Sequence, residues 1–300
     1  MGKDNSKKLV GQPLLKQIIK MLPRDEFDLL VAKYGSDRYY KTFFSWEQLI
    51  VMLFGIFSRC DSMGEVCDGM RALGGKLNHL GMDVAPAKST AGDALRDRDE
   101  ELFRLYYFSL IAYFRPLLSV SRKKDVSFEE FYAFDSTTVS LFSQVMKGVG
   151  RNPKDDGKKK GGLKVHMLTD VHTETAIFAK ISEAKMHDKK FLAHLNPGKG
   201  SMLVFDKAYN YYLQFAEWTR EGVNFVCRLK DNAKAQVQEV LFERQLSKEE
   251  FGVYKVEHIH LDYKEDKRIK TLCLRLVHYK DEKNRRYKFI TNNWEITPEE

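Results

Sequence analysis

Two aspartates that each follow a short apolar segment are the residues best placed to do chemistry. Asp135 comes after the aromatic run 131–134 and before the hydroxyl residues 136–138, and Asp206 comes after the apolar run 202–205. Such runs predict buried strands, and a buried strand holds the side chain at its end in a fixed position. Taken alone, Asp135 could instead form an Asx-turn that ends its strand.

The pairing of these carboxylates predicts a site for a divalent cation. Two carboxylates brought close together repel each other, unless a cation lies between them. Mg²⁺ prefers hard oxygen ligands of this kind. Asp170, where a strand is already turning, and Asp188, which opens a helix, compete for the second position, but neither ends an apolar run as Asp206 does. We therefore predict Asp135 and Asp206 as the metal ligands.

The order of elements around these aspartates predicts how they meet. From residue 131 to 229 the hydrophobic pattern gives strand, strand, strand, helix, strand, helix, strand. This order predicts an α/β fold, a mixed sheet with helices on its faces. It suits a ribonuclease-H-like topology, in which the first and fourth strands are neighbours. Asp135 and Asp206 would then meet at one edge of the sheet.

The N-terminal third has helical periodicity up to about Pro116, which predicts an all-α bundle. Capping-box patterns that begin at Ser45 and Ser62 each open a helix. The first of these helices, residues 45–57, is apolar nearly all round and is predicted to be the centre of the bundle. The last helix is predicted to begin at Asp99 and to stop at Pro116.

A short helix in this bundle is a candidate reader of DNA. Ser89 or Thr90 can cap it, and its exposed side is predicted to carry three cations, Lys88, Arg96 and Arg98. A helix-turn-helix reader presents a second helix of this kind to DNA. A plain helical bundle with a solvated basic face is the equal alternative.

The charge of the chain favours an anionic partner, with nucleic acid as the first candidate. The formal net charge is +8 and the pI is about 9.1. Over half of this excess lies in residues 147–164, where seven Lys or Arg stand against two Asp. The predicted DNA contacts of this lysine loop are Lys147, Arg151, Lys154, Lys158, Lys159 and Lys160.

Membrane insertion and thiol chemistry are not indicated by the sequence. The longest apolar run, residues 49–57, is too short to span a bilayer, and no signal peptide is recognised, which predicts a cytoplasmic location. The chain has no C-x-x-C pair, which predicts buried, reduced thiols rather than a zinc site or disulfides. His258 and His260 would share one face of a strand and are expected to line its solvated side rather than bind a metal. The four cysteines are Cys60, Cys67, Cys227 and Cys273.

Five motifs follow one another in order from about residue 126. They are Phe134-Asp-Ser-Thr-Thr138, Lys164-Val-His166, His187-Asp188, Val204-Phe-Asp-Lys-Ala-Tyr209 and Phe225-Val-Cys-Arg-Leu-Lys230. In this order and spacing they resemble the insertion-sequence-4 family of DDE transposases. The helical N-terminal region is similar to that of many bacterial members.

The resemblance implies a bacterial, nucleoid-associated DNA transposase. It would move its element by cut-and-paste transposition, as a homodimer on double-stranded DNA at terminal inverted repeats. In that family the aspartates matched by Asp135 and Asp206 are catalytic and bind two Mg²⁺ or Mn²⁺ ions for phosphoryl transfer. Lys164, His166 and Tyr209 match positions near the site, with phosphate positioning as the implied role. Strand packing is the alternative for His166.

The resemblance also implies a third carboxylate. The family carries it as a glutamate in a Tyr-Arg-Glu-Lys signature, on a helix after a β-rich insertion. Near the end of the sequence only Glu295, Glu299 and Glu300 occur, without Tyr or Arg neighbours. We expect the glutamate beyond Glu300, in a truncated chain. The expected domains are a helical domain at 1–118, a ribonuclease-H-like core at 119–230 and the β-rich insertion at 231–300.

Three other functions are compatible with the same residues. A catalytically inactive fragment could still bind terminal repeats, and a metal-dependent nuclease could share the fold without transposing DNA. The third alternative lies outside nucleic-acid chemistry: a structural helical bundle fused to an α/β domain, with Asp135 and Asp206 as simple strand-end caps.

Overall fold

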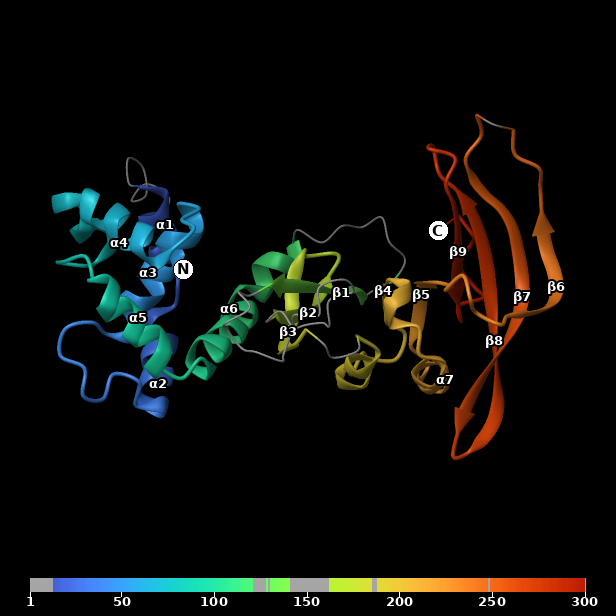
Figure 1. Cartoon of the computed structure of the whole chain (residues 1–300), viewed down its shortest axis with the longest axis horizontal. Coiled ribbons are helices and arrows are strands. Elements are labelled where there is room, and N and C mark those ends of the chain that lie inside the picture. Colours follow the sequence, from blue (N-terminus) through green and yellow to red (C-terminus); the bar gives the residue numbers. More distant parts are fainter. Residues whose placement is uncertain are drawn as a thin grey trace, which may run out of the picture. The chain divides into compact units, whose positions relative to one another are not determined.

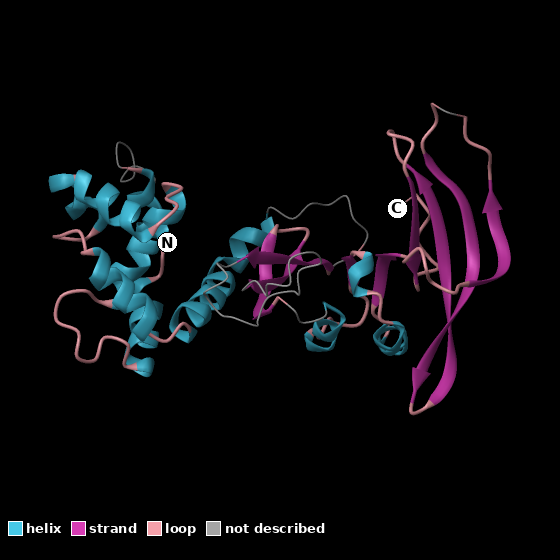
Figure 2. Ribbon diagram, viewed as in Figure 1, coloured by secondary structure: helices cyan, strands magenta, loops and turns pink. Residues whose placement is uncertain are grey.

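The computed structural model describes residues 13–120, 128, 130–140, 162–184, 188–247 and 249–299. They belong to two compact units, one up to Leu117 and one from Leu118 (Figure 1). The first unit is helical, and the second is a mixed sheet with helices (Figure 2). The predicted α/β class with a helical N-terminal region is confirmed.

The first unit is built around the helix that the sequence predicted as its centre. α3 (Ser45–Phe57) packs against α1 (Leu14–Met21), α4 (Met63–Ala72) and α5 (Lys88–Asp97). The remaining elements are α2 (Arg24–Tyr34), the 3-10 helix η2 (Gly74–Leu80) and α6 (Glu101–Val120). Within the residues described, no helix is both long and apolar enough to cross a bilayer.

Phe27 of α2 lies at the middle of the core of this unit. Its ring is fully buried, 5.1 Å from the ring of Trp46 and 4.9 Å from that of Tyr106. Both contacts are edge-to-face, the arrangement that aromatic pairs favour. The core thus joins α2 to α3 and to the first half of α6.

At one of the two predicted capping boxes the serine caps its helix as expected. Ser62 accepts a hydrogen bond from the backbone N–H of Glu65 at 3.2 Å and so caps α4. At α3 the cap position is taken by Phe44, not Ser45. The hydroxyl of Ser45 donates instead to the carboxylate of Asp37 at 2.6 Å, a strong charge-assisted hydrogen bond.

Two helix ends lie elsewhere than predicted. Ala87, not Ser89 or Thr90, is the N-cap of α5, since its backbone already has the extended form of a cap residue. α6 does not stop at Pro116 but continues to Val120. A proline removes one backbone donor and bends a helix, and here the helix tolerates that loss.

The arrangement of α4 and α5 favours the plain bundle over a tight helix-turn-helix. A helix-turn-helix pair is joined by a turn of about 3–4 residues. Between α4 and α5 the chain instead forms η2 and a further loop. Lys88 and Arg96 are exposed, as predicted. Arg96 is bonded to Asp93 at 3.0 Å and to Asp97 at 2.8 Å, so a DNA phosphate would compete with two carboxylates for it.

The prediction that Arg98 lies on an exposed face is wrong. Its side chain is only 1% exposed. The guanidinium donates to Gln48 Oε1 at 2.7 Å, to Ser36 O at 3.3 Å and to Phe43 O, and it lies over the ring of Tyr40 at 4.0 Å. Five donors in one plane can satisfy several buried acceptors at once, which explains an arginine in this position.

Replacement of Arg98 with methionine is expected to lower the free energy of unfolding by about 3 kcal/mol, because it leaves buried acceptors without their donor. Urea unfolding followed by circular dichroism measures the change. The control is Arg96→Met at an exposed position, expected to stay within about 0.5 kcal/mol. Equal effects of the two substitutions would contradict the structural role of Arg98.

Among the described residues the second unit has one nine-stranded sheet, in the order β3-β2-β1-β4-β5-β9-β8-β7-β6. Its first five strands along the chain are β1 (Phe131–Ser140), β2 (Gly162–Asp170), β3 (Thr175–Glu183), β4 (Met202–Phe205) and β5 (Asn224–Arg228). β4 runs parallel to both β1 and β5, whereas β2 is antiparallel to β1 and to β3. The predicted contact of the first and fourth strands is confirmed.

An aromatic cluster fixes the middle of this sheet. The helical segments η3 (Asp188–His194), η4 (Lys207–Tyr209) and α7 (Tyr212–Glu221) contribute to one core with β4 and β5. Phe215 of α7 lies 4.5 Å from Phe225 of β5 and 5.5 Å from Phe205 of β4, and Trp218 lies 5.8 Å from Phe205. Phe205, the residue before Asp206, is therefore anchored by three rings.

The C-terminal strands continue the same sheet. β7 (Gly252–Glu265), β8 (Arg268–Lys280) and β9 (Arg286–Thr291) lie in the segment 231–300 that was expected to be β-rich, and β9 pairs with both β5 and β8. The sequence has no strand pattern at β6 (Gln236–Glu243). Every residue of β6 is exposed, so it lacks the buried face that produces a strand pattern in a sequence.

A charged cluster ties α7 to the long hairpin of β7 and β8. Arg220 donates to Glu265 at 2.8 Å, and Lys270 donates to the same carboxylate at 2.5 Å. These bonds, first that of Arg220 and then that of Lys270, lower the pKa of Glu265 from 4.5 to about 2. Between about pH 2 and pH 4.5 the carboxylate is thus charged in the folded protein, whereas it would be protonated in the unfolded chain.

Because the folded pKa of Glu265 is the lower one, its contribution to stability is present above about pH 4.5 and is lost as the pH falls towards about 2. We expect the wild-type chain to lose more stability than Glu265→Gln between about pH 5 and pH 3. Urea unfolding at both pH values measures the difference. Parallel losses in the two proteins would contradict this expectation.

Candidate active site

The sheet places Asp135 and Asp206 side by side. Phe134 of β1 pairs in register with Phe205 of β4, and the two strands are parallel, so the next residue after each is an aspartate. The prediction that the strand ends at Asp135 is wrong: β1 continues to Ser140, and its pairing with β4 stops at Phe134, whereas Asp206 directly follows β4. Neighbouring strands are about 4.8 Å apart, and register-matched side chains project from the same face. Asp135 is exposed, and the side chain of Asp206 is 51% exposed. Both carboxylates can thus accept a ligand from solvent.

A cation lies beside the carboxylate of Asp206. Cys227 of β5 pairs with Phe205, so Arg228 follows beside Asp206, with its Nη1 atom 3.8 Å from the carboxylate Oδ1. The guanidinium also lies over the ring of Tyr287 at 5.0 Å. Arg228 stands in the fifth motif but was not predicted to have a role. Its proximity to Asp206 depends on the pairing of two strands, which residue spacing along the chain does not reveal.

Asn210 holds the segment after Asp206 against β5. Its amide donates to Cys227 Sγ at 2.9 Å and to Arg228 O at 3.0 Å, and its oxygen accepts from the N–H of Lys230 at 3.2 Å. Burial raises the pKa of the Cys227 thiol, and the charge of Asp206 raises it further. Cys227 therefore remains a neutral packing group rather than a nucleophile or a metal ligand.

Lys164 and His166 lie on the other face of the sheet. Asp135 pairs with Met167 of β2, whereas Ser136 pairs with His166 and Thr138 pairs with Lys164. Since paired residues share a face and successive residues alternate, Lys164 and His166 project away from the side of Asp135. Both are buried.

The surroundings of His166 and Tyr209 are those of core residues. The ring of His166 is stacked on Phe191, and its Nε2 lies 3.2 Å from Ser182 Oγ. Tyr209 is buried in η4, with its ring 4.9 Å from that of Phe134. The strand-packing alternative for His166 agrees with this placement. The structure does not bring these side chains to the paired carboxylates.

The two rival aspartates have other placements. Asp170 accepts from the backbone N–H groups of His172 at 2.8 Å and Thr173 at 3.3 Å, an Asx-turn between β2 and β3. It pairs in register with Tyr132 rather than with the end of β1. Asp188 is the first residue of η3. Asp135 and Asp206 are therefore the two aspartates that follow the last paired residues of the adjacent strands β1 and β4.

An open hollow of about 450 Å³ lies beside Asp206. Lys207 and Lys230 also line it, together with Ala208, Asp231 and Asn232. Lys207 Nζ is bonded to Asp231 at 3.1 Å, and Asp231 is 91% exposed. A negatively charged ligand that entered this hollow would meet Lys207 and Lys230. Arg228 lies beside the carboxylate of Asp206.

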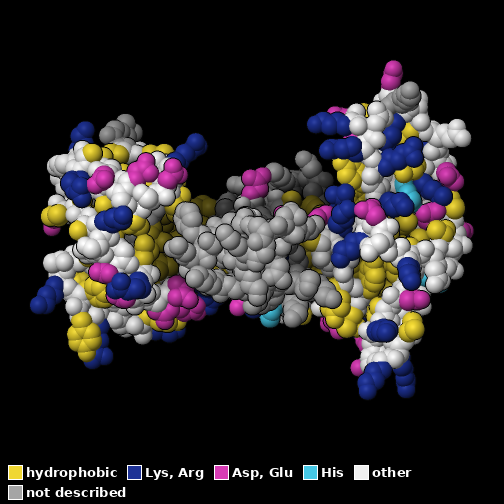
Figure 3. Space-filling model, in the orientation of Figure 1, with side chains coloured by type: hydrophobic (Ala, Val, Ile, Leu, Met, Phe, Trp, Pro, Cys, Tyr) yellow, Lys and Arg dark blue, Asp and Glu magenta, His cyan; other side chains and the backbone are white. Residues whose placement is uncertain are grey.

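Other cations lie farther along the second unit. Figure 3 shows many Lys and Arg side chains over the C-terminal strands, and exposed ones in this region are Lys264, Lys267, Arg268, Arg286 and Lys288. Residues 147–161 of the lysine loop lie outside the described residues, and with them the six predicted contacts Lys147, Arg151, Lys154, Lys158, Lys159 and Lys160. Their role as DNA contacts stays a prediction.

The chemistry of the donors fits a hard divalent cation. Two exposed carboxylates, directly after the paired residues Phe134 and Phe205 of adjacent strands, provide oxygen ligands, which Mg²⁺ and Mn²⁺ prefer. Carboxylates, waters and phosphate oxygens together complete such sites in enzymes that act on phosphates. Arg228, Lys207 and Lys230 supply the positive charge that a phosphate needs nearby.

The fold and the carboxylate pair define an α/β protein with a candidate phosphoryl-transfer site where the pairing of β1 with β4 ends. The family model described as a transposase DDE domain matches residues 126–300, and the chain belongs to this family. A second model, described as a domain of unknown function (DUF4372), matches residues 10–83. No curated protein matches the chain. The predicted kinship with DDE transposases is confirmed.

Proposed function

We propose that this chain is the transposase of an insertion sequence of the insertion-sequence-4 type. It cuts and rejoins double-stranded DNA at terminal inverted repeats, in a cut-and-paste reaction catalysed at Asp135 and Asp206. The observation that carries this proposal is the parallel register of β1 and β4, which puts the two aspartates next to each other. The strand order of β1 to β5 supports a ribonuclease-H-like core.

In this proposal Asp135 and Asp206 hold two Mg²⁺ or Mn²⁺ ions. The ions would activate the attacking oxygen and neutralise the charge on the leaving oxygen. β1 and β4 orient both carboxylates, because Phe134 and Phe205, the residues directly before the two aspartates, are buried in the core. Arg228, Lys207 and Lys230 bind the phosphates that flank the scissile one, the role that the buried Lys164 and His166 do not fill.

The partner in this proposal is DNA bound by a homodimer. Phosphate contacts come from the cations around Asp206 and from the lysine loop, and they supply affinity without sequence preference. Recognition of the terminal repeats is assigned to the helical unit. Its exposed Lys88 is a predicted contact, whereas Arg98 supports that unit from within.

Binding of Mn²⁺ tests the carboxylate pair without requiring activity. Electron paramagnetic resonance measures the free ion during a titration of the whole chain. We expect Asp135→Asn and Asp206→Asn to weaken binding by at least about tenfold, since each loses a charged ligand. Asp170→Asn is the matched control, because asparagine can keep its turn. Equal binding by all four proteins would overturn the assignment.

Binding and cleavage of labelled DNA test the reaction. The wild-type chain should prefer a fragment with the terminal repeat over a scrambled fragment. Its affinity should fall steeply with salt as counterions are released. Mg²⁺ should then yield cuts at the end of the element. Cuts without end preference would indicate a nuclease, and affinity that does not change with salt would exclude the proposed phosphate contacts.

A further inference from the structure

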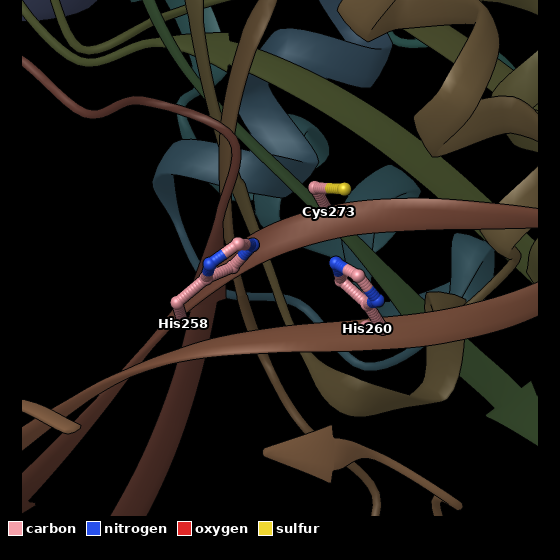
Figure 4. Close-up of side chains that lie close together, drawn as sticks. All are labelled: His258, His260 and Cys273. Carbon is pink, nitrogen blue, oxygen red and sulfur yellow. The ribbon is translucent and has the colours of Figure 1, made fainter. Parts of the chain in front are cut away.

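Three side chains of the kinds that bind transition metals gather on the C-terminal strands. His258 and His260 belong to β7, and Cys273 belongs to β8. One ring nitrogen of each histidine and the cysteine sulfur all lie within 4.8 Å of one another. Figure 4 shows the two imidazoles on one strand and the thiol on its neighbour. None of the three takes part in the proposed reaction at Asp135 and Asp206.

The register of the hairpin brings these residues together. His260 pairs directly with Cys273, and His258 lies two residues earlier on the same face. The opposite face of both strands is core, with Ile259 and Leu274 fully buried. The backbone that carries the three side chains is therefore held rigidly, as a metal site requires.

His258 offers an observation that points to a ligand. Its Nε2 atom is buried and has no hydrogen-bond partner. The ring lies edge-on to Trp294 at 5.4 Å and to His260 at 5.1 Å, contacts that do not satisfy a ring nitrogen. A buried polar atom left without a partner destabilises the folded state. A bond to a metal ion would remove that cost.

We propose that His258, His260 and Cys273 form a zinc site between β7 and β8, with water in the fourth position. Zinc binds imidazole at about 2.0–2.1 Å and thiolate at about 2.3 Å, so its ligand atoms are roughly 3.5 Å apart in a tetrahedron. From the present spacing of at most 4.8 Å, small side-chain rotations close the site. Mg²⁺ does not fit this set, because it prefers oxygen ligands.

The charges around the site are compatible with a thiolate. On binding, the S–H bond of Cys273 breaks, sulfur bonds to zinc, and the proton leaves to solvent. Arg275, the register partner of His258, is a buried cation whose Nη1 donates to Ile296 O at 2.8 Å. The thiolate balances part of the positive charge that Arg275 and the ion bring together.

The site would fasten β8 to β7 at a point where, among the described residues, β8 has no second partner strand. β9 pairs with β8 only from Arg275 onward, so at Cys273 the strand β8 is hydrogen-bonded to β7 alone. A metal that bridges Cys273 to His258 and His260 locks this register. The structural role follows from the position: zinc stabilises the outer strands rather than taking part in phosphoryl transfer.

Cobalt titration tests the site, because Co²⁺ replaces zinc and its bond to a thiolate gives a charge-transfer absorption. The whole chain is used with any polyhistidine tag removed. We expect one Co²⁺ per chain with a thiolate band that zinc abolishes. Cys273→Ser should lose the band, and His260→Gln should weaken binding at least about tenfold. Cys60→Ser, the matched thiol control, should keep it.

The outcome is separable from that of the proposed function. Asp135→Asn should keep the cobalt band, since it lies outside the site. Zinc should also raise the melting temperature of the wild-type chain and not that of Cys273→Ser, as expected for an ion that binds only the folded form. A folded wild-type chain without the band, or a band that survives Cys273→Ser, would overturn the zinc site.

Discussion

Replacement of Asp206 with asparagine is expected to lower the rate of metal-dependent DNA cleavage by about 10³-fold or more. Asparagine keeps the shape of the side chain but removes the negative charge that would hold the ions. A thousandfold loss corresponds to about 4 kcal/mol of transition-state stabilisation, the order that a lost metal ligand accounts for. Asp135→Asn should have a similar effect, because each aspartate directly follows one residue of the register pair Phe134 and Phe205.

DNA binding should respond in the opposite direction. The carboxylate of Asp206 lies 3.8 Å from Arg228, and its neutralisation leaves that cation free to attract phosphate. We therefore expect Asp206→Asn to bind DNA as tightly as the wild type or more tightly. Cleavage and gel-shift assays on one labelled fragment measure both effects, with Asp170→Asn as the control. Wild-type cleavage by Asp135→Asn and Asp206→Asn would refute the site.

Replacement of Phe205 with alanine is expected to lower the free energy of unfolding of the second unit by about 3–5 kcal/mol. Phe205 is buried between Phe215, Trp218 and Phe225. Alanine would leave a cavity among rings that are held by β5 and α7 and cannot collapse freely. Phe205→Leu fills much of this space and should cost less.

Chemical unfolding followed by far-ultraviolet circular dichroism measures this loss. The control is Phe251→Ala, whose ring is 53% exposed and which should change stability by only about 0.5 kcal/mol. Because Phe205 directly precedes Asp206, Phe205→Ala should also weaken Mn²⁺ binding under conditions where the protein is folded. A loss of stability no larger than that of Phe251→Ala would show that the cluster does not anchor this strand end.

The aspartate pair was predictable because local sequence carried the needed information. Each aspartate ends an apolar run, and the order of strands and helices favours one topology with β1 beside β4. Those two features suffice to place Asp135 and Asp206 together. Arg228 needed one further fact, the register of β4 with β5, which no spacing along the chain reveals.

Burial of polar side chains was the main feature that the sequence did not predict. Arg98 looks like a surface cation until the acceptors Gln48 and Phe43 O, distant in sequence, are known. Lys164 and His166 alternate with apolar residues, yet theirs is the buried face of β2. The ring of Phe191 explains the inward position of His166.

The cysteines show the same limit. Cys67 and Cys227 are buried as predicted, but Cys60 is partly exposed and the prediction for Cys273 is wrong, because it is exposed. A metal site whose ligands come from two strands of a hairpin has no C-x-x-C signature. Only the register of β7 with β8 places Cys273 opposite His260.

The position of β9 between β5 and β8 affects how this protein emerges from the ribosome. β6, β7 and β8 are successive along the chain and pair as neighbours, so they can form as soon as they are synthesised. One edge of β5 stays unpaired until β9 has been synthesised. Phe289 and Thr291 of β9 then pair with Arg228 and Val226 of β5, respectively. Until then a nascent chain exposes an unpaired strand edge, the feature that most readily joins the wrong partner. Translation pauses before residue 286 would prolong that exposure.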